Sequence, residues 1–288
     1  MSRIAIENRT IGILRWVTIA FLLVITVFPF YYMVTLSFVP IEKLLLHPER
    51  LWVPISDFTL DTYATVLASV DDGGQGFAAF MRNSGIVALL TSLITLAVAI
   101  PGAYAVSRLK FFGQRQISVL FLAVYLFPTI IIAIPLFVGF SAIGIRESLV
   151  GLVIVYIAQT IPVSIHMLRS YMQTMPVSIE EAAMVDGASR FRILWTMTIP
   201  LAMPTIVSTA LYVFMIAWNE FLFALLFLTA DRDLWTVSLG LSQLSNGIEV
   251  SKTVLMAGSV LLTVPIIILY GIAERALTEG LTSGADKG

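Results

Sequence analysis

The stretch PVSIEEAAMVDGASRFRILWTMTIPLAMP, residues 176–204, is polar and basic although it lies in a strongly apolar chain. Ser178 and Glu181 have the three-residue spacing of a capping box, and Glu180 and Glu181 add negative charge where a helix N-terminus favours it. We therefore expect a short helix to begin at Ser178. Gly187 can adopt the positive φ that ends a helix. The stretch predicts a short helix, a glycine break and a second short helix, both facing water.

The second predicted helix has a cap and an apolar face. Ser189 stands where it can cap this helix. Apolar and threonine side chains follow at i, i+3, i+4 and i+7, the spacing of one helical face: Phe191, Leu194, Trp195 and Thr198. We expect this stripe to end where Pro200 and Pro204 intervene. Two interpretations of the helical pair stay open on periodicity alone. It is either a docking site for another protein or a pair lying on the membrane, with Arg190 and Arg192 near lipid headgroups.

The composition around this stretch is that of a membrane protein. Of the 288 residues 58% are hydrophobic and only 12% charged, whereas a soluble domain has roughly 25% charged residues. Six apolar runs are long enough to cross a hydrocarbon core of ~30 Å: 13–37, 84–106, 117–140, 149–168, 205–228 and 254–273. The first run exceeds the core of a signal peptide, so we expect it to be retained. The sequence predicts one all-α polytopic membrane domain, residues 1–288, with six transmembrane helices.

The distribution of basic residues predicts the orientation of these spans. An even number of spans places both termini on one side of the membrane, and the side richer in Lys and Arg is the cytoplasm. With both termini inside, eleven of the seventeen Lys and Arg residues are cytoplasmic. This orientation makes the loop 169–204 and the tail 274–288 cytoplasmic and the loop 38–82 external.

Several kinds of functional site have no counterpart in the sequence. No Gly-x-x-x-x-Gly-Lys-Ser/Thr phosphate loop occurs, so ATP hydrolysis, if it drives this protein, takes place on another polypeptide. Cysteine is absent, and the two histidines, His47 and His166, have no carboxylate pair at metal-binding spacing. We therefore predict no metal site, no catalytic residue and no cofactor in this chain.

Three short motifs of the polar stretch resemble a known pattern. Glu181-Ala182-Ala183, Asp186-Gly187-Ala188 and Ile199-Pro200 together resemble the cytoplasmic EAA motif of ABC importer permeases. In that family the motif forms a coupling helix that sits in a groove of a separate ATP-hydrolysing subunit. The resemblance implies a type I ABC importer permease fold. It also implies a coupling role for seven residues: Glu181, Ala182, Ala183, Asp186, Gly187, Ala188 and Pro200.

The resemblance extends beyond this loop and is closest to the MalG-like permeases of carbohydrate importers. Four further segments carry it: FMRNS at 80–84, AYAVSR at 103–108, AWNEF at 217–221 and GLTSGADKG at 280–288. In that family the C-terminal tail reaches the ATPase subunit, which implies such contacts for Gly280, Gly284 and Lys287. Asp286 stands where the family usually has an apolar residue, which implies an altered tail contact.

One carboxylate lies inside a predicted span. Glu220 follows Trp218 and Asn219 in the fifth run, and intramembrane charges often mark a polar pathway. Carbohydrate recognition commonly combines an aromatic face with amide and carboxylate groups, so these three residues are candidates for the substrate pathway. The alternative is that Glu220 lies at the outer boundary, where water or a headgroup solvates it. The outer stretch 229–253, with Trp235, Leu239 and Leu241, is long enough to touch an external binding protein or to form a lid.

The resemblance implies the permease subunit of an ATP-driven sugar importer, half of a translocation pathway, in a bacterial or archaeal cell membrane. The implied partners are a second homologous permease, two ATP-binding subunits that hold ATP and Mg²⁺, an extracytoplasmic sugar-binding protein and membrane lipid, with no nucleic acid. Two alternatives stay open. One is a secondary transporter driven by an ion gradient, for which inverted repeats and charge relays are expected. The other is an ABC permease for a substrate that is not a sugar.

Overall fold

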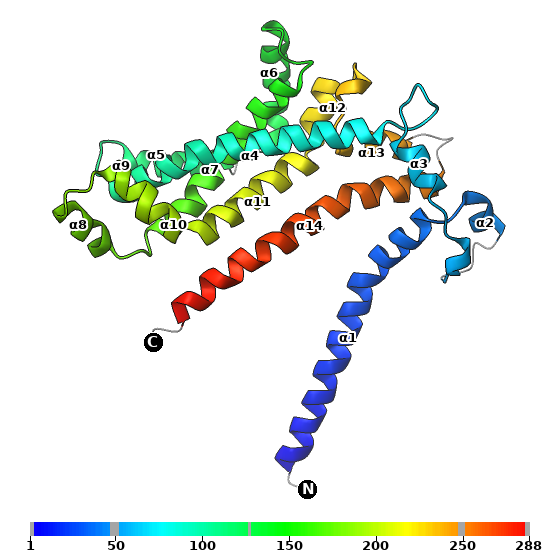
Figure 1. The fold of residues 1–288 in the computed structure, drawn as a ribbon, viewed down its shortest axis with the longest axis horizontal. Helices are drawn as coiled ribbons and strands as arrows, with labels where there is room; N and C mark the ends of the chain where they lie inside the picture. Colours follow the sequence, from blue (N-terminus) through cyan, green and yellow to red (C-terminus); the bar gives the residue numbers. More distant parts are fainter. Residues whose placement is uncertain (1–2, 47–51, 126–127, 247–250, 286–288) are drawn as a thin grey trace. The chain divides into compact units, whose positions relative to one another are not determined.

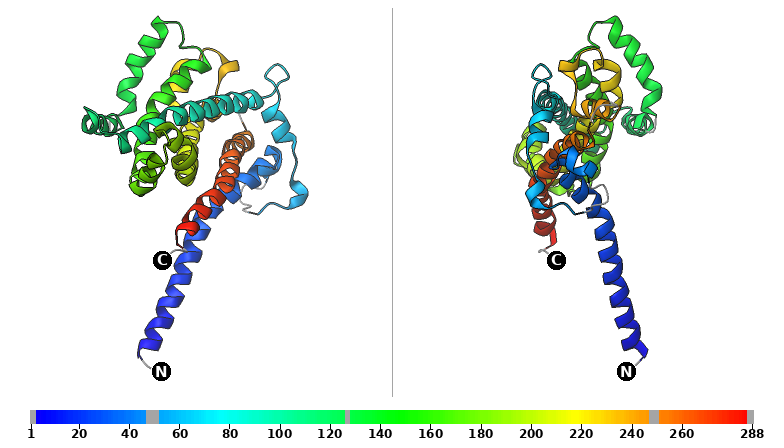
Figure 2. Two further views of the ribbon diagram at one scale, coloured as in Figure 1. Left: turned by 60° about the vertical axis from the view of Figure 1, so that its left-hand side comes forward. Right: turned by 90° about the vertical axis from the view of Figure 1, so that its right-hand side faces the viewer.

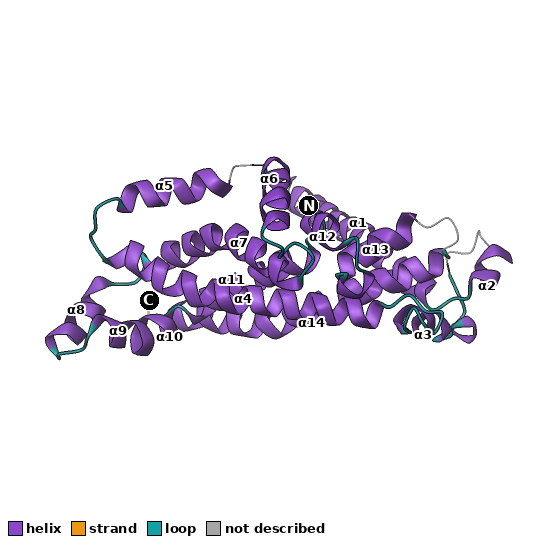
Figure 3. Cartoon of the chain, turned by 90° about the horizontal axis from the view of Figure 1, so that it is seen from above, coloured by secondary structure: helices purple, strands orange, loops and turns teal. Residues whose placement is uncertain are grey.

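A computed structural model describes residues 3–46, 52–125, 128–246 and 251–285, and every regular element in these ranges is a helix (Figure 3). The all-α prediction is confirmed for the described part of the chain. The chain divides into two compact units. The first consists of Met1–Gly76 with Gln243–Leu261, and the second of Phe77–Ser242 with Leu262–Gly288.

The first unit begins with α1 (Arg3–Ser37), which is followed by short helices: α2 (Ile41–Leu46), η1 (Ile55–Asp57) and α3 (Asp61–Leu67). α1 has apolar side chains on all its faces, the pattern of a helix solvated by lipid rather than by water on one side. Just after α1, the chain folds back on itself. The Thr59 amide donates to the Phe38 carbonyl at 2.8 Å, and the Ser37 and Tyr63 hydroxyls lie 2.7 Å apart.

The second unit is built on three helices that lie side by side, α4 (Phe77–Arg108), α7 (Leu149–Met172) and α11 (Met203–Asn219) (Figures 1 and 2). Small residues let α4 and α7 approach closely. A Cβ on Gly102 of α4 would lie 3.3 Å from Ile165 of α7. The buried hydroxyls of Thr95 and Thr160 lie 3.0 Å apart across the same interface, so each satisfies the other away from water.

The remaining elements connect or flank these three helices. They are α5 (Gln114–Tyr125), α6 (Thr129–Ala142), α8 (Val177–Val185), α9 (Arg190–Ile193), the π turn η2 (Leu194–Thr198), α10 (Ile199–Leu201), α12 (Leu222–Leu228), η3 (Arg232–Leu234), α13 (Val237–Asn246) and α14 (Lys252–Ala285). α14 begins in the first unit and ends in the second.

The described residues contain four helices that are long and apolar enough to cross a membrane: Ile11–Ser37, Phe77–Arg108, Leu149–Met172 and Lys252–Glu274. A fifth span results if Arg190–Leu201 and Met203–Asn219, bent by 79°, count as one. The predicted run 117–140 holds two helices, α5 and α6, and the run 205–228 holds α11 and α12. Since broken helices also occur at membrane depth when protein covers them, six spans stay a prediction.

At the N-terminal end of α4, the stretch after α12 is fixed by specific contacts. The Asn83 amide donates to the carbonyls of Asp233 and Trp235, at 2.7 and 3.0 Å. A Cβ on Gly240 would lie 2.4 Å from the Phe80 ring, so only glycine fits there. Leu239 is buried, and Trp235 packs against Phe80 with ring centroids 5.7 Å apart. These two apolar residues of the stretch 229–253 are therefore used inside the second unit.

Candidate functional site: a helical hairpin and a helix break

The helical pair predicted at residues 176–204 is called the hairpin from here on. It begins with α8, one residue earlier than the sequence predicts. Its N-cap is Pro176, with φ −59°, and no side chain caps the helix. Ser178 therefore lies inside the first turn, and the predicted capping box between Ser178 and Glu181 is wrong. The physical reason is that proline has its φ fixed near the value that leads into a helix. Pro176 thereby moves the helix start ahead of the serine.

The end of α8 matches the prediction. Gly187 has φ +83°, its amide donates to the Met184 carbonyl at 3.0 Å, and the Ala188 amide donates to the Ala183 carbonyl at 2.9 Å. These two bonds form a Schellman motif, which favours glycine because a Cβ is strained at this φ. Ser189 then caps α9, and its hydroxyl accepts the Arg192 amide at 3.3 Å. The glycine break and the serine cap are both confirmed.

A buried ion pair attaches α8 to the end of α4. Arg108 Nε donates to Glu180 Oε1 at 2.8 Å, and the Tyr104 hydroxyl donates to Glu180 Oε2 at 3.2 Å. Arg108 also donates to the Met175 carbonyl at 3.0 Å. The two charged side chains are only 7% and 6% exposed. Each carboxylate oxygen therefore has a donor, as a buried charge requires.

The opposite face of α8 is exposed in the described part of the chain. Glu181, Ala182 and Asp186 are exposed, and Val185 is 88% exposed. Of the predicted coupling residues, Ala183 is buried. The helix thus has one face anchored through Glu180 and one face that combines small, apolar and acidic side chains. Such a face suits a groove of another protein.

The second half of the hairpin differs from the predicted stripe. Leu194 and Thr198 are buried, whereas Phe191 is 72% and Trp195 57% exposed, with ring centroids 6.0 Å apart. The single apolar face is therefore wrong. Leu194 packs in the apolar core cluster, to which Phe191 and Trp195 do not belong, and the π turn Leu194–Thr198 replaces α-helical spacing from Leu194 onward.

The root of the hairpin joins the helical core at the same end as Arg108. Leu194 packs in an apolar cluster with residues of α4, α7 and the start of α11: Ala99, Ala103, Tyr104, Ile165, Leu168, Met172, Ala202 and Ile206. Pro200 is exposed next to the 79° bend that precedes α11. The Tyr171 hydroxyl donates to the Leu201 carbonyl at 3.1 Å and ties this bend to α7.

Sequence reasoning did not find Arg108 or Tyr104 as members of this site. In the sequence, the segment 103–108 stands out only as a family pattern, and Glu180 only as a helix-terminal charge. The pairing joins residues 72 positions apart. No local spacing rule connects positions so distant, so the fold alone reveals the pair.

The second candidate site is a break between α11 and α12 at Glu220. The Glu220 carboxylate accepts the Tyr156 hydroxyl at 2.5 Å and the Phe223 amide at 2.9 Å, and the Ala224 amide at 3.3 Å. The amides of Phe223 and Ala224 lie in the first turn of α12, where backbone N–H groups have no partner within the helix and where negative charge is favoured. Glu220 is thus an acidic cap that joins α7, α11 and α12.

The two residues before Glu220 have different surroundings. Trp218 is buried, stacks on Phe214 with ring centroids 5.6 Å apart, and donates its indole N–H to the Leu262 carbonyl at 3.0 Å. Asn219 is exposed and donates to the Met215 carbonyl at 2.9 Å. The three residues therefore do not converge on one cavity, and their role in a substrate pathway stays a prediction.

A cavity of about 360 Å³ lies next to this break, between α6, α7, α11 and α12. Its walls are mostly apolar, with Thr129, Gln159 and Tyr212 as polar or amphipathic members and Phe223 as an aromatic one. Phe223 links the cavity to the break, because its backbone amide is bound by Glu220. No pattern in the sequence predicts this cavity, because its lining residues are spread over four helices.

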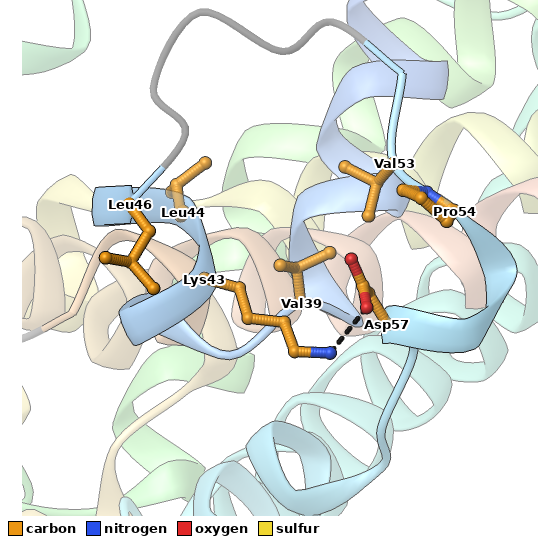
Figure 4. Close-up of a pocket in the computed structure, with 7 residues that line it drawn as sticks. All are labelled: Val39, Lys43, Leu44, Leu46, Val53, Pro54 and Asp57. Atoms are coloured by element: carbon orange, nitrogen blue, oxygen red, sulfur yellow. Dashed lines mark hydrogen bonds and ion pairs between the residues drawn. The ribbon is translucent and has the colours of Figure 1, made fainter.

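A second cavity, of about 280 Å³, lies in the first unit just after α1 (Figure 4). Lys43 reaches across to Asp57, with Nζ and Oδ1 2.5 Å apart, and the walls include Val39, Leu44 and Val53. The lysine and the carboxylate neutralise each other, so the cavity presents no net charge.

The C-terminal tail is only partly described. Gly280 and Gly284 belong to α14, but the side chains after Glu274 and all of Lys287 lie outside the described residues. Contacts of this tail with an ATPase subunit stay a prediction. Within the described ranges no group of three or more His, Asp or Glu side chains is arranged to hold a metal ion.

Comparison with known proteins gives one family and several relatives. Residues 97–282 match the family described as the binding-protein-dependent transport system inner membrane component. The inner membrane ABC transporter permease protein YcjP of Escherichia coli is 38% identical over 94% of each chain. The trehalose/maltose transport system permease protein MalG of Thermococcus litoralis is 38% identical over 92% of this chain and 93% of its own.

A third relative and a solved structure extend the comparison. The trehalose transport system permease protein SugB of Mycobacterium tuberculosis is 33% identical over 81% of this chain and 84% of its own. A crystal structure of a bacterial ABC transporter involved in the import of the acidic polysaccharide alginate contains a chain of similar fold, with a TM-score of 0.80. It covers 96% of this chain and 98% of that chain at 23% identity, so the likeness concerns the fold alone.

Proposed function

This chain belongs to the family of binding-protein-dependent transport system inner membrane components, and we propose that it is the permease subunit of an ATP-driven sugar importer. The relatives confirm the resemblance to MalG-like permeases and a multi-pass protein of the inner membrane. Those named for trehalose and maltose transport support sugar as the substrate class. In this proposal the chain forms half of the translocation pathway and carries no catalytic group.

One observation carries the proposed coupling role. α8 is held to the spanning helix α4 through the buried Glu180 and Arg108, while its other face, with Glu181 and Asp186, is exposed. A helix that is rigidly attached on one side and open on the other can transmit a push from a docked partner to the spans. The partner is an ATPase subunit that binds ATP and Mg²⁺ outside this chain.

The proposed mechanism is allosteric coupling between two binding events. ATP binding draws two ATPase subunits together, and each pulls on the hairpin docked to it. The hairpin moves α4, α7 and α11, because Leu194 and Ala202 are packed in the same apolar cluster as these helices. The loaded extracytoplasmic binding protein favours the same outward-facing state, so nucleotide and sugar reinforce each other.

The proposed sugar path passes the cavity beside the helix break. Tyr212 and Phe223 offer aromatic faces, and Gln159 offers an amide, the groups that commonly recognise a sugar ring. A second, homologous permease supplies the other half of the path. The Glu220 cap sets the start of α12, so it acts on the cavity through Phe223 rather than by lining it.

Identification of the partner chains tests this function. We expect the full chain, co-expressed with its partners and purified gently, to co-elute with a protein that contains a phosphate loop. Gly187→Val should remove that protein, because a β-branched residue is strained at φ +83°. Gly144→Val, at φ +73° in the connection between α6 and α7, is the matched control and should keep it. An ATPase retained equally by both variants would contradict the coupling role.

Energisation separates this proposal from an ion-gradient transporter. The carboxylate of Glu220 already accepts from Tyr156, Phe223 and Ala224, an arrangement that favours a structural cap over a proton relay. In proteoliposomes supplied with ATP, collapse of the ion gradient should leave uptake unchanged. Loss of uptake under these conditions would favour the ion-driven alternative.

A further inference from the structure

A basic hollow lies where α4 ends and α9 begins. It has a volume of about 670 Å³, and its walls are Arg108, Leu109, Lys110, Phe111 and Arg190. Three of these five residues are cations. The coupling role proposed above uses only Arg108, so Lys110 and Arg190 have no part in it.

The hollow carries uncompensated positive charge. Glu180 neutralises Arg108, at 2.8 Å. Lys110 and Arg190 are both exposed, and Arg190 lies beside the hydroxyl of Tyr104, a neutral group. Two positive charges therefore face the hollow, one from each helix end, and a phosphate diester would complement them. A guanidinium fork and a lysine ammonium are the side chains that bind phosphate oxygens most strongly.

The position along the chain indicates where the ligand comes from. Arg108 is the last residue of the spanning helix α4, and two aromatic residues follow it within four positions. Phe112 is 101% exposed, and Phe111 is also exposed. Phe and Trp side chains combined with Lys and Arg are typical of segments at the boundary between membrane and water. Phe191 and Trp195, exposed just after Arg190, extend this pattern.

We propose that this hollow binds the phosphate group of an anionic phospholipid from the cytoplasmic leaflet. Lys110 and Arg190 hold the phosphate, and Phe111 and Phe112 lie among the upper parts of the lipid chains. The proposal rests on the cytoplasmic placement of the hairpin in the proposed function. The bound headgroup links the end of α4 to the start of α9, so the hairpin is supported on one side by lipid and on the other by Glu180.

The two interpretations of the helical pair, a docking site and a segment on the membrane surface, then apply to different halves of the pair. α8 presents the face proposed to dock, with Glu181 and Asp186, and its acidic groups would repel an anionic membrane. α9 and the π turn present Arg190, Phe191 and Trp195, which suit the membrane boundary. Lipid composition would then act on coupling through the root of the hairpin.

Lipid retention by the purified full chain tests the proposal. Delipidated protein is mixed with phosphatidylglycerol or phosphatidylcholine, and bound lipid is counted by native mass spectrometry. We expect wild type to prefer phosphatidylglycerol, and the double variant Lys110→Glu/Arg190→Glu to lose that preference on the order of tenfold. Arg192→Glu makes the same charge change two residues along, outside the hollow, and should keep it. The neutral double variant Lys110→Gln/Arg190→Gln is the control for misfolding, because its melting temperature should equal that of wild type.

Each other outcome overturns the proposal. An equal loss in Arg192→Glu would mean general surface charge, and competition by millimolar inorganic phosphate would mean a free-anion site. If the double variant keeps phosphatidylglycerol but loses its ATPase partner, the hollow belongs to a protein interface. Because lipid counting needs neither ATP nor transport, its failure is distinguishable from failure of the proposed function.

Discussion

Arg108 at the end of α4 and Glu180 in the first turn of α8 form an almost completely buried ion pair, with Nε and Oε1 2.8 Å apart. The Tyr104 hydroxyl donates to the second carboxylate oxygen, and the Met175 carbonyl accepts from Arg108. A buried pair of this kind fixes one geometry strongly, because either charge left alone is poorly solvated. The position of α8 relative to α4 is therefore specified by the small group of hydrogen bonds around Glu180 and Arg108.

Removing one partner of this pair should be costly. We expect Arg108→Ala to lower the free energy of unfolding by about 3–5 kcal/mol, because Glu180 is left buried without its cation. Lys43→Ala breaks a pair that is 47% and 25% exposed, and should cost at most about 1 kcal/mol. Thermal unfolding of both variants in detergent checks this. The charge-swapped double variant Arg108→Glu/Glu180→Arg should recover part of the loss; equal effects of the two alanine variants would contradict it.

The cap at Glu220 should matter for transport rather than for assembly. Glu220→Gln keeps one acceptor oxygen but loses the charge that favours the amides of Phe223 and Ala224. We expect slower sugar uptake in proteoliposomes and unchanged co-purification of the ATPase subunit. Tyr156→Phe removes one donor to the same carboxylate and should slow uptake in the same direction. Unchanged uptake kinetics in Glu220→Gln would remove this residue from the pathway.

The close approach of Gly240 to Phe80 gives a packing prediction. A methyl group on Gly240 would lie 2.4 Å from the ring of Phe80, which is itself buried against Trp235. We expect Gly240→Ala to destabilise the protein by about 1–3 kcal/mol. Gly85→Ala is the control, because Gly85 lies in α4 with open space around it, and alanine there should stabilise by about 0.5–1 kcal/mol. Melting temperatures that fall equally would show that the contact is not rigid.

The absence of native cysteine makes the orientation directly testable. Val185 on α8 and Ile55 in η1 are both more than four-fifths exposed, at 88% and 83%. We expect an impermeant maleimide to label Val185→Cys only in inside-out vesicles and Ile55→Cys only in right-side-out vesicles. The reverse pattern would place the hairpin outside the cell and would end the coupling proposal.

Features set by a few neighbouring residues were predicted correctly. The glycine break at Gly187 and the cap at Ser189 depend on hydrogen bonds within about five residues. The apolar runs follow from composition alone, and four of them contain helices that are long and apolar enough to cross a membrane by themselves, whereas the runs 117–140 and 205–228 are each divided between two helices. The local prediction failed at Pro176, which starts α8 before Ser178, because two local signals competed and the proline prevailed.

Features that join distant positions were decided by the tertiary structure. The Arg108–Glu180 pair and the Tyr156–Glu220 bond span 72 and 64 positions, and no pattern in one sequence links such residues. The π turn at Leu194–Thr198 is similar, since packing against the core decides which of its side chains are buried. In an apolar chain hydrophobicity determines where the helices lie. It does not determine which helices pack together, because nearly every span could pack against any other. Rare polar contacts and close-fitting glycines then choose their partners, because burying a polar group without a hydrogen bond costs free energy.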